Sequence, residues 1–229
     1  MFVVLNTTCL NSSWYLARFF AILLLMSKPA RYRIPADEIA VEIVIKNSIF
    51  IATGAYTPTL AAAEAFVARV KADYADASHN CVAYRVGYGS NAAERASDDG
   101  EPSGTAGRPM ISVLQGQDLG DIAVVVTRYF GGTKLGTGGL VRAYSGAVRA
   151  LLAEMPTRMR IERKRRQLTI PYSRFQPIKK FLLSYECQIE HEEFAADVTF
   201  RFSIPVDRIK EFDQQLTEFS HGRLSATDL

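Results

Sequence analysis

The sequence of 229 residues has few of the residue types that build metal centres or disulfide frameworks. Its three cysteines are odd in number and far apart, and its three histidines are equally scattered. This distribution argues against a disulfide-rich scaffold, a Cys-x-x-Cys metal pair and a structural zinc site. We therefore expect a reducing, cytoplasmic location, with no metal and no cofactor.

An apolar run long enough to span a bilayer is also lacking. The most apolar stretch, Trp14 to Met26, has about 13 residues interrupted by Arg18, whereas a membrane helix needs about 20. No basic segment precedes it and no cleavage motif follows it, which disfavours a secretory signal. We expect residues 1–28 to be a leader outside the folded domains, with Met26 as a candidate true start and no membrane partner. An N-terminal anchor is the alternative.

Neither sign of charge dominates the composition. The chain has 27 basic and 24 acidic residues, which gives a net charge of +3. Hydrophobic residues make up 48% of the sequence. Such a composition is ordinary for a globular chain and excludes wholesale disorder. The densest basic cluster is expected to be a linker, residues 158–166, that joins a domain at 29–157 to a second domain at 167–229. Its basic residues are Arg158, Arg160, Arg163, Lys164, Arg165 and Arg166.

The first domain shows both strand and helix patterns. Val41, Ile43 and Ile45 alternate with polar residues, which predicts a half-buried strand that pairs with a second strand at 49–55. A helix is expected to begin at Thr57-Pro58 with Thr57 as its cap and to run to Tyr74. The other expected elements are a strand at 80–87, a long loop at 89–108, a short helix at 109–115, a buried strand at 121–127 and a helix at 140–155.

In the second domain the predicted elements follow a β-α-β-β-α-(β) order. The expected strands lie at 167–172, 187–194, 197–204 and 223–226, and the expected helices at 175–185 and 206–220. This order is typical of the split βαβ, ferredoxin-like arrangement. The sequence therefore predicts an α+β protein of two domains.

An acidic loop offers candidate catalytic residues. Asp98, Asp99 and Glu101 lie within four positions, close enough for general acid/base chemistry or for two of them to share a cation. The same residues are also ordinary turn formers, so a rigid surface turn is the alternative. His79, at the mouth of the expected strand, is a fourth candidate, whereas Cys81 is expected to be an inert buried thiol.

A glycine-rich loop follows the buried strand at 121–127 and leads into a helix. Glycines let backbone N–H groups approach an anion, and a helix N-terminus adds a favourable dipole. The loop matches neither the Walker A motif nor the dinucleotide fingerprint. Two interpretations of the loop stay open. It is either a binding site for phosphate, including the phosphates of RNA, or a tight structural turn. The residues expected to bind phosphate or nucleic acid are Arg128, Gly131, Gly132, Lys134, Gly136, Gly139 and Arg142.

Several motifs occur together in one order along the chain. They are His79-Asn-Cys-Val-Ala-Tyr84, Ser97-Asp-Asp-Gly-Glu-Pro-Ser-Gly-Thr-Ala-Gly107, Val126-Thr-Arg-Tyr-Phe-Gly-Gly132 and Gly139-Leu-Val-Arg-Ala-Tyr144. In this combination the chain resembles the YigZ/IMPACT family over residues 31–155. The C-terminal domain resembles the small ferredoxin-like module of bacterial members.

The resemblance carries expectations about fold and function. It implies an N-terminal α+β sandwich like the second domain of a small-subunit ribosomal protein and domain IV of elongation factor G, followed by a module like domain V of that factor. It also implies a ribosome- or RNA-associated regulator of translation. Two alternatives stay open, namely an enzyme acting on a phosphorylated small molecule and a protein-interaction module that docks the Ser97–Gly107 loop on a partner. The oligomeric state is not indicated, and catalysis is uncertain, with the balance against an enzyme.

Overall fold

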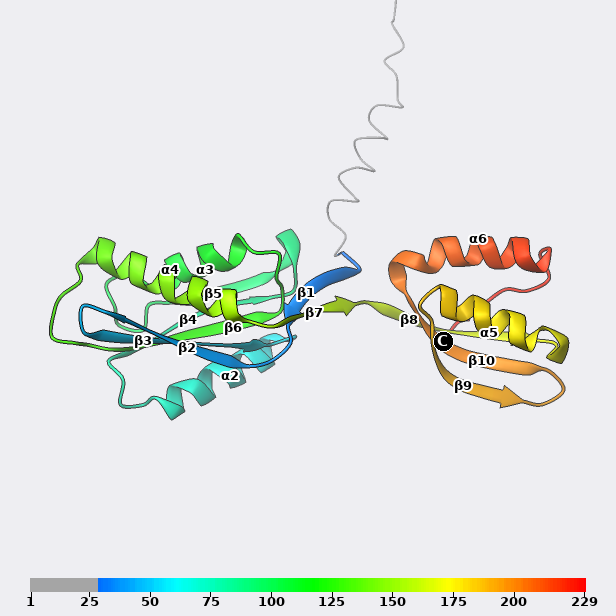
Figure 1. Ribbon diagram of the computed structural model, residues 1–229, viewed down its shortest axis with the longest axis horizontal. Helices are drawn as coiled ribbons and strands as arrows, with labels where there is room; N and C mark the ends of the chain where they lie inside the picture. Colours follow the sequence, from blue (N-terminus) through cyan, green and yellow to red (C-terminus); the bar gives the residue numbers. More distant parts are fainter. Residues whose placement is uncertain (1–28) are drawn as a thin grey trace, which may run out of the picture.

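The computed structural model describes residues 29–229, so the expectation for residues 1–28 lies outside the described residues. Two domains lie side by side, with strands β1 (Arg31–Pro35) and β7 (Thr157–Ile161) between them (Figure 1). These two strands pair antiparallel as a two-stranded ribbon. Because β1 precedes the sheet of the first domain and β7 follows its last helix, the ribbon brings the two ends of that domain together.

The first domain is built on a five-stranded antiparallel sheet. In spatial order its strands are β2 (Ile39–Ile45), β3 (Ser48–Tyr56), β6 (Ile122–Tyr129), β4 (His79–Val86) and β5 (Ala93–Ser97). The hairpin expected near residues 41–55 is the β2–β3 pair. β6 is the central strand, and its position explains why its sequence is almost continuously apolar.

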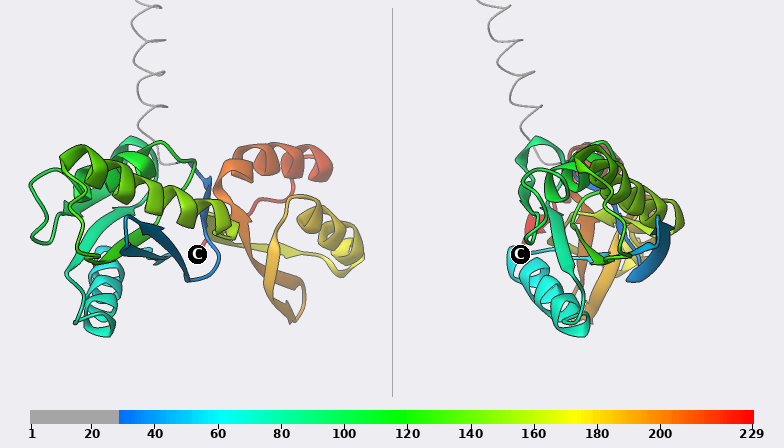
Figure 2. Two further views of the ribbon diagram at one scale, coloured as in Figure 1. Left: turned by 60° about the vertical axis from the view of Figure 1, so that its left-hand side comes forward. Right: turned by 90° about the vertical axis from the view of Figure 1, so that its left-hand side faces the viewer.

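Helices cover both faces of this sheet (Figures 1 and 2). Helix α2 (Leu60–Asp73) lies on one face, and α3 (Gly107–Gln115) and α4 (Thr137–Glu154) lie on the other. Successive residues of β6 point to opposite faces. Val124 and Val126 accordingly pack in the core under α3 and α4, while Ala123 and Val125 pack in the core beside α2.

The second domain has the predicted ferredoxin-like arrangement. Its elements in chain order are β8 (Arg163–Ile170), α5 (Phe175–Ser184), β9 (Gln188–Phe194), β10 (Val198–Pro205), α6 (Ile209–Ser220) and β11 (Thr227–Asp228). The strands lie in the order β11-β8-β10-β9, all antiparallel. The two-domain α+β fold class predicted from the sequence is therefore confirmed.

Contacts between the domains are polar and partly exposed. Arg31 of β1 donates to Glu186 at 3.1 Å and to Asp207 at 2.7 Å, both in the second domain. The backbone N–H of Val206 donates to the carbonyl of Glu162, the residue between β7 and β8, at 2.9 Å. Exposed ion pairs of this kind contribute about 0–1 kcal/mol each, so the covalent β7–β8 connection dominates the junction.

The basic segment expected as a linker differs from that expectation. Most of residues 158–166 lie in β7 and at the start of β8. Strand β7 is held by β1, which no sequence pattern had indicated, and Arg166 is buried with its guanidinium bonded to Asp213 and to the carbonyl of Ala226 at 2.6 Å each. The basic residues of this segment therefore lie along strands β7 and β8 and do not form a solvated linker between the domains.

Two further details of the first domain also depart from expectation. The residues between Gly89 and Arg108, expected as one long loop, contain the edge strand β5, whose side chains are mostly exposed. Helix α2 is capped by Thr59, whose hydroxyl accepts from the N–H of Ala62 at 3.1 Å, and not by Thr57. No helix within residues 29–229 is both long enough and apolar enough to cross a membrane.

Candidate phosphate-binding site

The acidic loop is folded around the carboxylate of Asp98. This carboxylate accepts backbone N–H bonds from Gly104 at 2.7 Å, Ala106 at 2.9 Å and Gly107 at 2.8 Å. Burial alone would raise the pKa of Asp98, but the three N–H donors outweigh burial and hold it below its usual value. Asp98 therefore fixes the shape of the loop and leads the chain into α3.

Asp99 anchors the same loop to the sheet. Its carboxylate forms an ion pair with Lys71 and accepts the N–H of Asn80 at 2.7 Å, and its carbonyl lies 2.8 Å from Nδ1 of His79. Burial raises the pKa of Asp99, but Lys71 and the N–H of Asn80 together bring it below its usual value. Asp98, Asp99 and His79 thus hold the loop in place through their own hydrogen bonds.

These depressed pKa values predict a loss of stability in acid. A carboxylate whose folded pKa is lowered stabilises the fold above its unfolded pKa, and this contribution disappears as the pH falls through the folded value. We expect the free energy of unfolding, measured in urea, to fall below about pH 4. The fall should be shallower in Asp98→Asn, whereas Asp37→Asn, at an exposed position, should follow the wild type. An unchanged pH profile in Asp98→Asn would refute the structural role of this carboxylate.

Glu101 points inward and forms a buried network. Its Oε1 accepts from Nη1 of Arg128 at 2.6 Å and from the hydroxyl of Tyr144 at 2.7 Å. The side chains of Glu101 and Arg128 are only 3% and 6% exposed, and burial raises the pKa of Tyr144, which keeps its hydroxyl a donor. The network ties the acidic loop, β6 and α4 together.

The guanidinium of Arg128 lies between two aromatic rings. It is 5.4 Å from the ring centroid of Phe50 and 5.4 Å from that of Phe130. Its Nη2 also approaches Oγ of Ser48 at 3.4 Å, and this hydroxyl accepts the N–H of Gly131 at 3.1 Å. Cation–π contacts and hydrogen bonds thus fix the orientation of Arg128.

A cavity of about 380 Å³ opens beside this network at the start of α4. It is lined by Glu101, Pro102, Arg128, Phe130, Lys134, Leu135, Gly136, Thr137 and Leu140. Nε of Arg128 is buried and has no hydrogen-bond partner among the described residues. A buried donor without a partner costs about 1–3 kcal/mol, so Arg128 retains unused hydrogen-bonding capacity next to the cavity.

The N-terminus of α4 faces the same cavity through Gly136 and Thr137. No side chain caps this end, and Gly136 adopts a φ of 72°. The first N–H groups of a helix lack intrahelical partners and carry the positive end of the helix dipole. Gly136, Thr137 and Gly138 are exposed, and a Cβ atom at Gly138 would meet no atom within 4 Å, so this end of the helix is not covered by other side chains. The cavity can therefore receive an anion.

The structure brings some of the predicted site residues together and separates others. Glu101, Arg128, Lys134 and Gly136 line the cavity. Gly132, with a φ of 81°, belongs to the same loop, and Gly139 lies in the first turn of α4. Arg142 is exposed further along α4, and His79, Asp98 and Asp99 do not line the cavity.

Sequence reasoning missed two hydroxyls of the site. Ser48 and Tyr144 supply the hydrogen bonds that orient Gly131 and Glu101, although no motif marks Ser48. Cys81 is fully buried, and burial raises its pKa to about 12, in agreement with an inert thiol. Within residues 29–229 no group of three or more His, Cys, Asp or Glu side chains is placed to hold a metal ion.

Each of the two domains matches a known family of protein domains. Residues 46–152 match the Impact N-terminal domain, and residues 168–223 match a domain of unknown function, DUF1949. IMPACT family member YigZ of Escherichia coli is 40% identical over 192 residues, which cover 83% of this chain and 94% of that protein. An IMPACT family member of Haemophilus influenzae is 39% identical, covering 85% of this chain and 95% of its own length.

A solved structure is similar over nearly the whole described fold. It is titled as the crystal structure of a hypothetical protein, is 38% identical, and superimposes with a TM-score of 0.61. The match covers 88% of this chain and 98% of the other. The α+β fold of this chain is therefore shared with a relative of known structure.

Proposed function

The chain belongs to the IMPACT family, and on this premise we propose that it is a ribosome- or RNA-associated regulator of translation that binds phosphate groups at the start of α4. The observation that carries the proposal is the cavity that Arg128, Lys134 and the uncapped N-terminus of α4 line together. This function would place the protein in the cytoplasm, with RNA or the ribosome as its partner.

The positive groups of the cavity outnumber the one carboxylate that lines it. Glu101 neutralises Arg128 and is held by it and by Tyr144, so its Oε1 does not turn toward an incoming anion. Lys134 is exposed, and no carboxylate of the described residues lies within ion-pair distance of it. A phosphate would therefore meet the free ammonium of Lys134, the positive charge of the Arg128 guanidinium and the helix dipole, which together favour an oxyanion.

The surroundings favour RNA over a small phosphate ester. Arg108, Arg142 and Arg149 lie on α3 and α4 on the side of the sheet that carries the cavity. With Lys134 they form a set that we call the basic face, and none of them forms an ion pair among the described residues. Uncompensated positive charge on one face is the electrostatic footprint of proteins that bind nucleic acid. Phe130, which is 49% exposed beside Arg128, adds a ring on which a base can stack.

The proposal predicts salt-dependent binding of RNA that requires Lys134. We expect a fluorescent single-stranded oligonucleotide to bind with an affinity that falls steeply as salt rises, because bound phosphates displace counterions. Lys134→Ala should weaken binding at all sequences and lower the salt slope by about 0.7, the value for one phosphate contact on a single strand. Fluorescence anisotropy over a range of salt concentrations measures both effects.

Lys210→Ala is the matched control, since Lys210 is exposed on α6 in the second domain, away from the cavity. It should leave affinity and slope unchanged. Binding that is absent in the wild type, or that ignores salt, would contradict the proposal. Equal losses in Lys134→Ala and Lys210→Ala would indicate a general charge effect and would also contradict it.

A further inference from the structure

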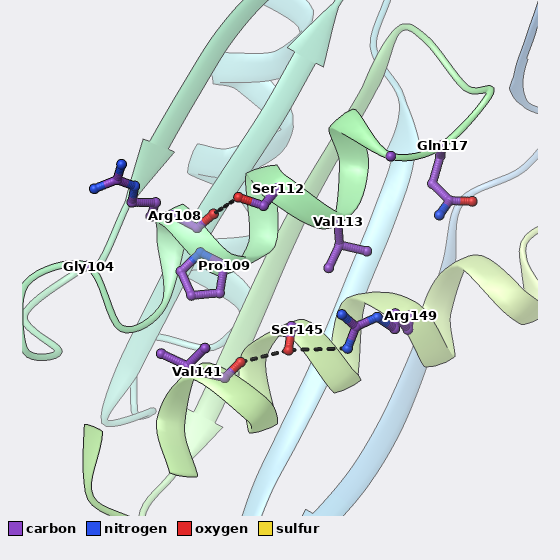
Figure 3. Close-up of a pocket in the computed structure, with 10 residues that line it drawn as sticks. Gly104, Arg108, Pro109, Ser112, Val113, Gln117, Val141, Ser145 and Arg149 are labelled. Atoms are coloured by element: carbon purple, nitrogen blue, oxygen red, sulfur yellow. Dashed lines mark hydrogen bonds between the residues drawn. The ribbon is translucent and has the colours of Figure 1, made fainter. Parts of the chain in front are cut away.

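A second hollow lies between α3 and α4, next to the phosphate cavity. This groove has a volume of about 560 Å³ and is open to solvent. Pro109 and Val113 of α3 face Val141 and Ser145 of α4 across it (Figure 3). The groove is thus lined by apolar side chains together with hydroxyl groups and charges.

The charge at the edges of the groove is of one sign. Arg108 lies at the end near Gly104, and Arg149 lies toward the opposite end, where Gln117 also lines the groove (Figure 3). No acidic residue lines the groove. Nη1 of Arg149 donates only to Oγ of Ser145, at 3.3 Å, a bond that leaves the positive charge uncompensated. The groove therefore attracts an anion that reaches from one end to the other.

The groove and the phosphate cavity are lined by the same two segments, the acidic loop and α4. Residues 102 and 104 of the acidic loop line the cavity and the groove respectively. Along α4, Thr137 lines the cavity and Arg149 lines the groove, and the 12 residues between their positions correspond to about 18 Å of helix. Arg142 lies three residues before Ser145 and hence on the same side of the helix. One phosphate group cannot cover this distance, but a chain of phosphates can.

We propose that the α3–α4 groove is a second backbone subsite, along which a single strand of RNA continues from the phosphate cavity over Arg142 and Arg108 to Arg149. This proposal rests on the phosphate-binding function proposed above and adds the path and the length of the ligand. The basic residues contact the sugar–phosphate backbone, and base stacking is confined to Phe130 at the cavity.

The lining of the groove favours an RNA backbone over an acidic peptide. The groove has no deep apolar pocket for an anchoring side chain, because Pro109, Val113 and Val141 form a shallow floor. It contains no aromatic ring, so bases are not read there, and its donors are guanidinium, hydroxyl and amide groups. Binding along the groove is therefore expected to depend on strand length and little on sequence.

The test compares short and long oligouridylates by fluorescence anisotropy. A strand of about two nucleotides fills the cavity alone, whereas a strand of about ten nucleotides also reaches the groove. We expect the wild type to bind the long strand more tightly. The double variant Arg108→Ala/Arg149→Ala should weaken binding of the long strand about tenfold and reduce its salt slope by about 1.4, while binding of the short strand stays unchanged. Both arginines are exposed, and circular dichroism checks that the variant is folded.

Control variants separate failure of this inference from failure of the proposed function. Lys134→Ala should weaken both strands, and Arg223→Ala, exposed after α6, should weaken neither. If the double variant binds the long strand as the wild type does, the RNA does not follow the groove. Phosphate binding in the cavity is not contradicted by that result. If the wild type binds neither strand, the proposed function fails. If polyglutamate displaces the long strand and binds through the same two arginines with equal affinity, the groove is a peptide site and the RNA path is overturned.

Discussion

Replacing Glu101 with alanine is expected to lower the free energy of unfolding by about 3–5 kcal/mol, because the guanidinium of Arg128 stays buried without its carboxylate. The two side chains are 3% and 6% exposed, so the remaining charge is solvated far less well than at the surface. The hydroxyl of Tyr144 loses its acceptor in the same variant. Urea unfolding at neutral pH, followed by circular dichroism, measures the change.

Two variants show whether burial of the pair causes this loss. Glu38→Ala removes an exposed carboxylate from Arg69, where the side chains are 43% and 48% exposed, and should cost less than about 1 kcal/mol. Replacing both members, as in Glu101→Leu with Arg128→Met, should give a protein more stable than Glu101→Ala, because no buried charge remains unpaired. If Glu101→Ala costs no more than Glu38→Ala, the buried network does not hold the loop.

Substitution of Gly131 by alanine is expected to destabilise the protein by about 3 kcal/mol. A Cβ atom at this position would lie 2.0 Å from the carbonyl carbon of Asn47 and 2.4 Å from the N of Ser48. These are backbone atoms of the β2–β3 turn, so they cannot rotate away. Relief of the clash would separate the two loops and stretch the bond from the N–H of Gly131 to Oγ of Ser48.

Gly138→Ala is the matched control for this substitution. Gly138 lies in the first turn of α4, and a Cβ atom there would meet nothing within 4 Å. Because alanine favours a helix over glycine, the expected change in the free energy of unfolding is neutral or stabilising by up to about 1 kcal/mol. Thermal unfolding of Gly131→Ala and Gly138→Ala measures the change in stability of each variant. Equal stability of the two would mean that Gly131 is not required for close packing.

Elements with a strong pattern could be predicted from the sequence. The apolar run at 121–127 predicted the central strand β6, and the glycines after it predicted the turn into α4. The ferredoxin-like order of the second domain followed from its periodicities. Strands β1, β5 and β7 could not be predicted, because each has only five residues. β5 and β7 are also mostly exposed, and β1 and β7 depend on pairing with each other across the whole first domain.

The residues of the candidate site could likewise be predicted only in part. Arg128, Lys134 and Gly136 were expected near an anion, and they line one cavity. Glu101 was proposed for acid/base chemistry, but its pairing with Arg128, 27 residues away, depends on how Asp98 folds the loop. Ser48 could not be found, because a single hydroxyl in a hairpin carries no pattern. Charge type and glycine content are local properties of a sequence, whereas buried pairing depends on the tertiary fold.

The central claim is that phosphate binds at the N-terminus of α4. The most direct measurement is an NMR titration of the folded protein with a single-stranded RNA oligonucleotide, in which the backbone amide resonances are followed. We predict the largest shifts at Thr137, Gly138 and Gly139 and in the side-chain Nε–H of Arg128, and we predict that these shifts are lost in Lys134→Glu. Binding of RNA that leaves these amides unshifted, or shifts confined to the second domain, would contradict the claim.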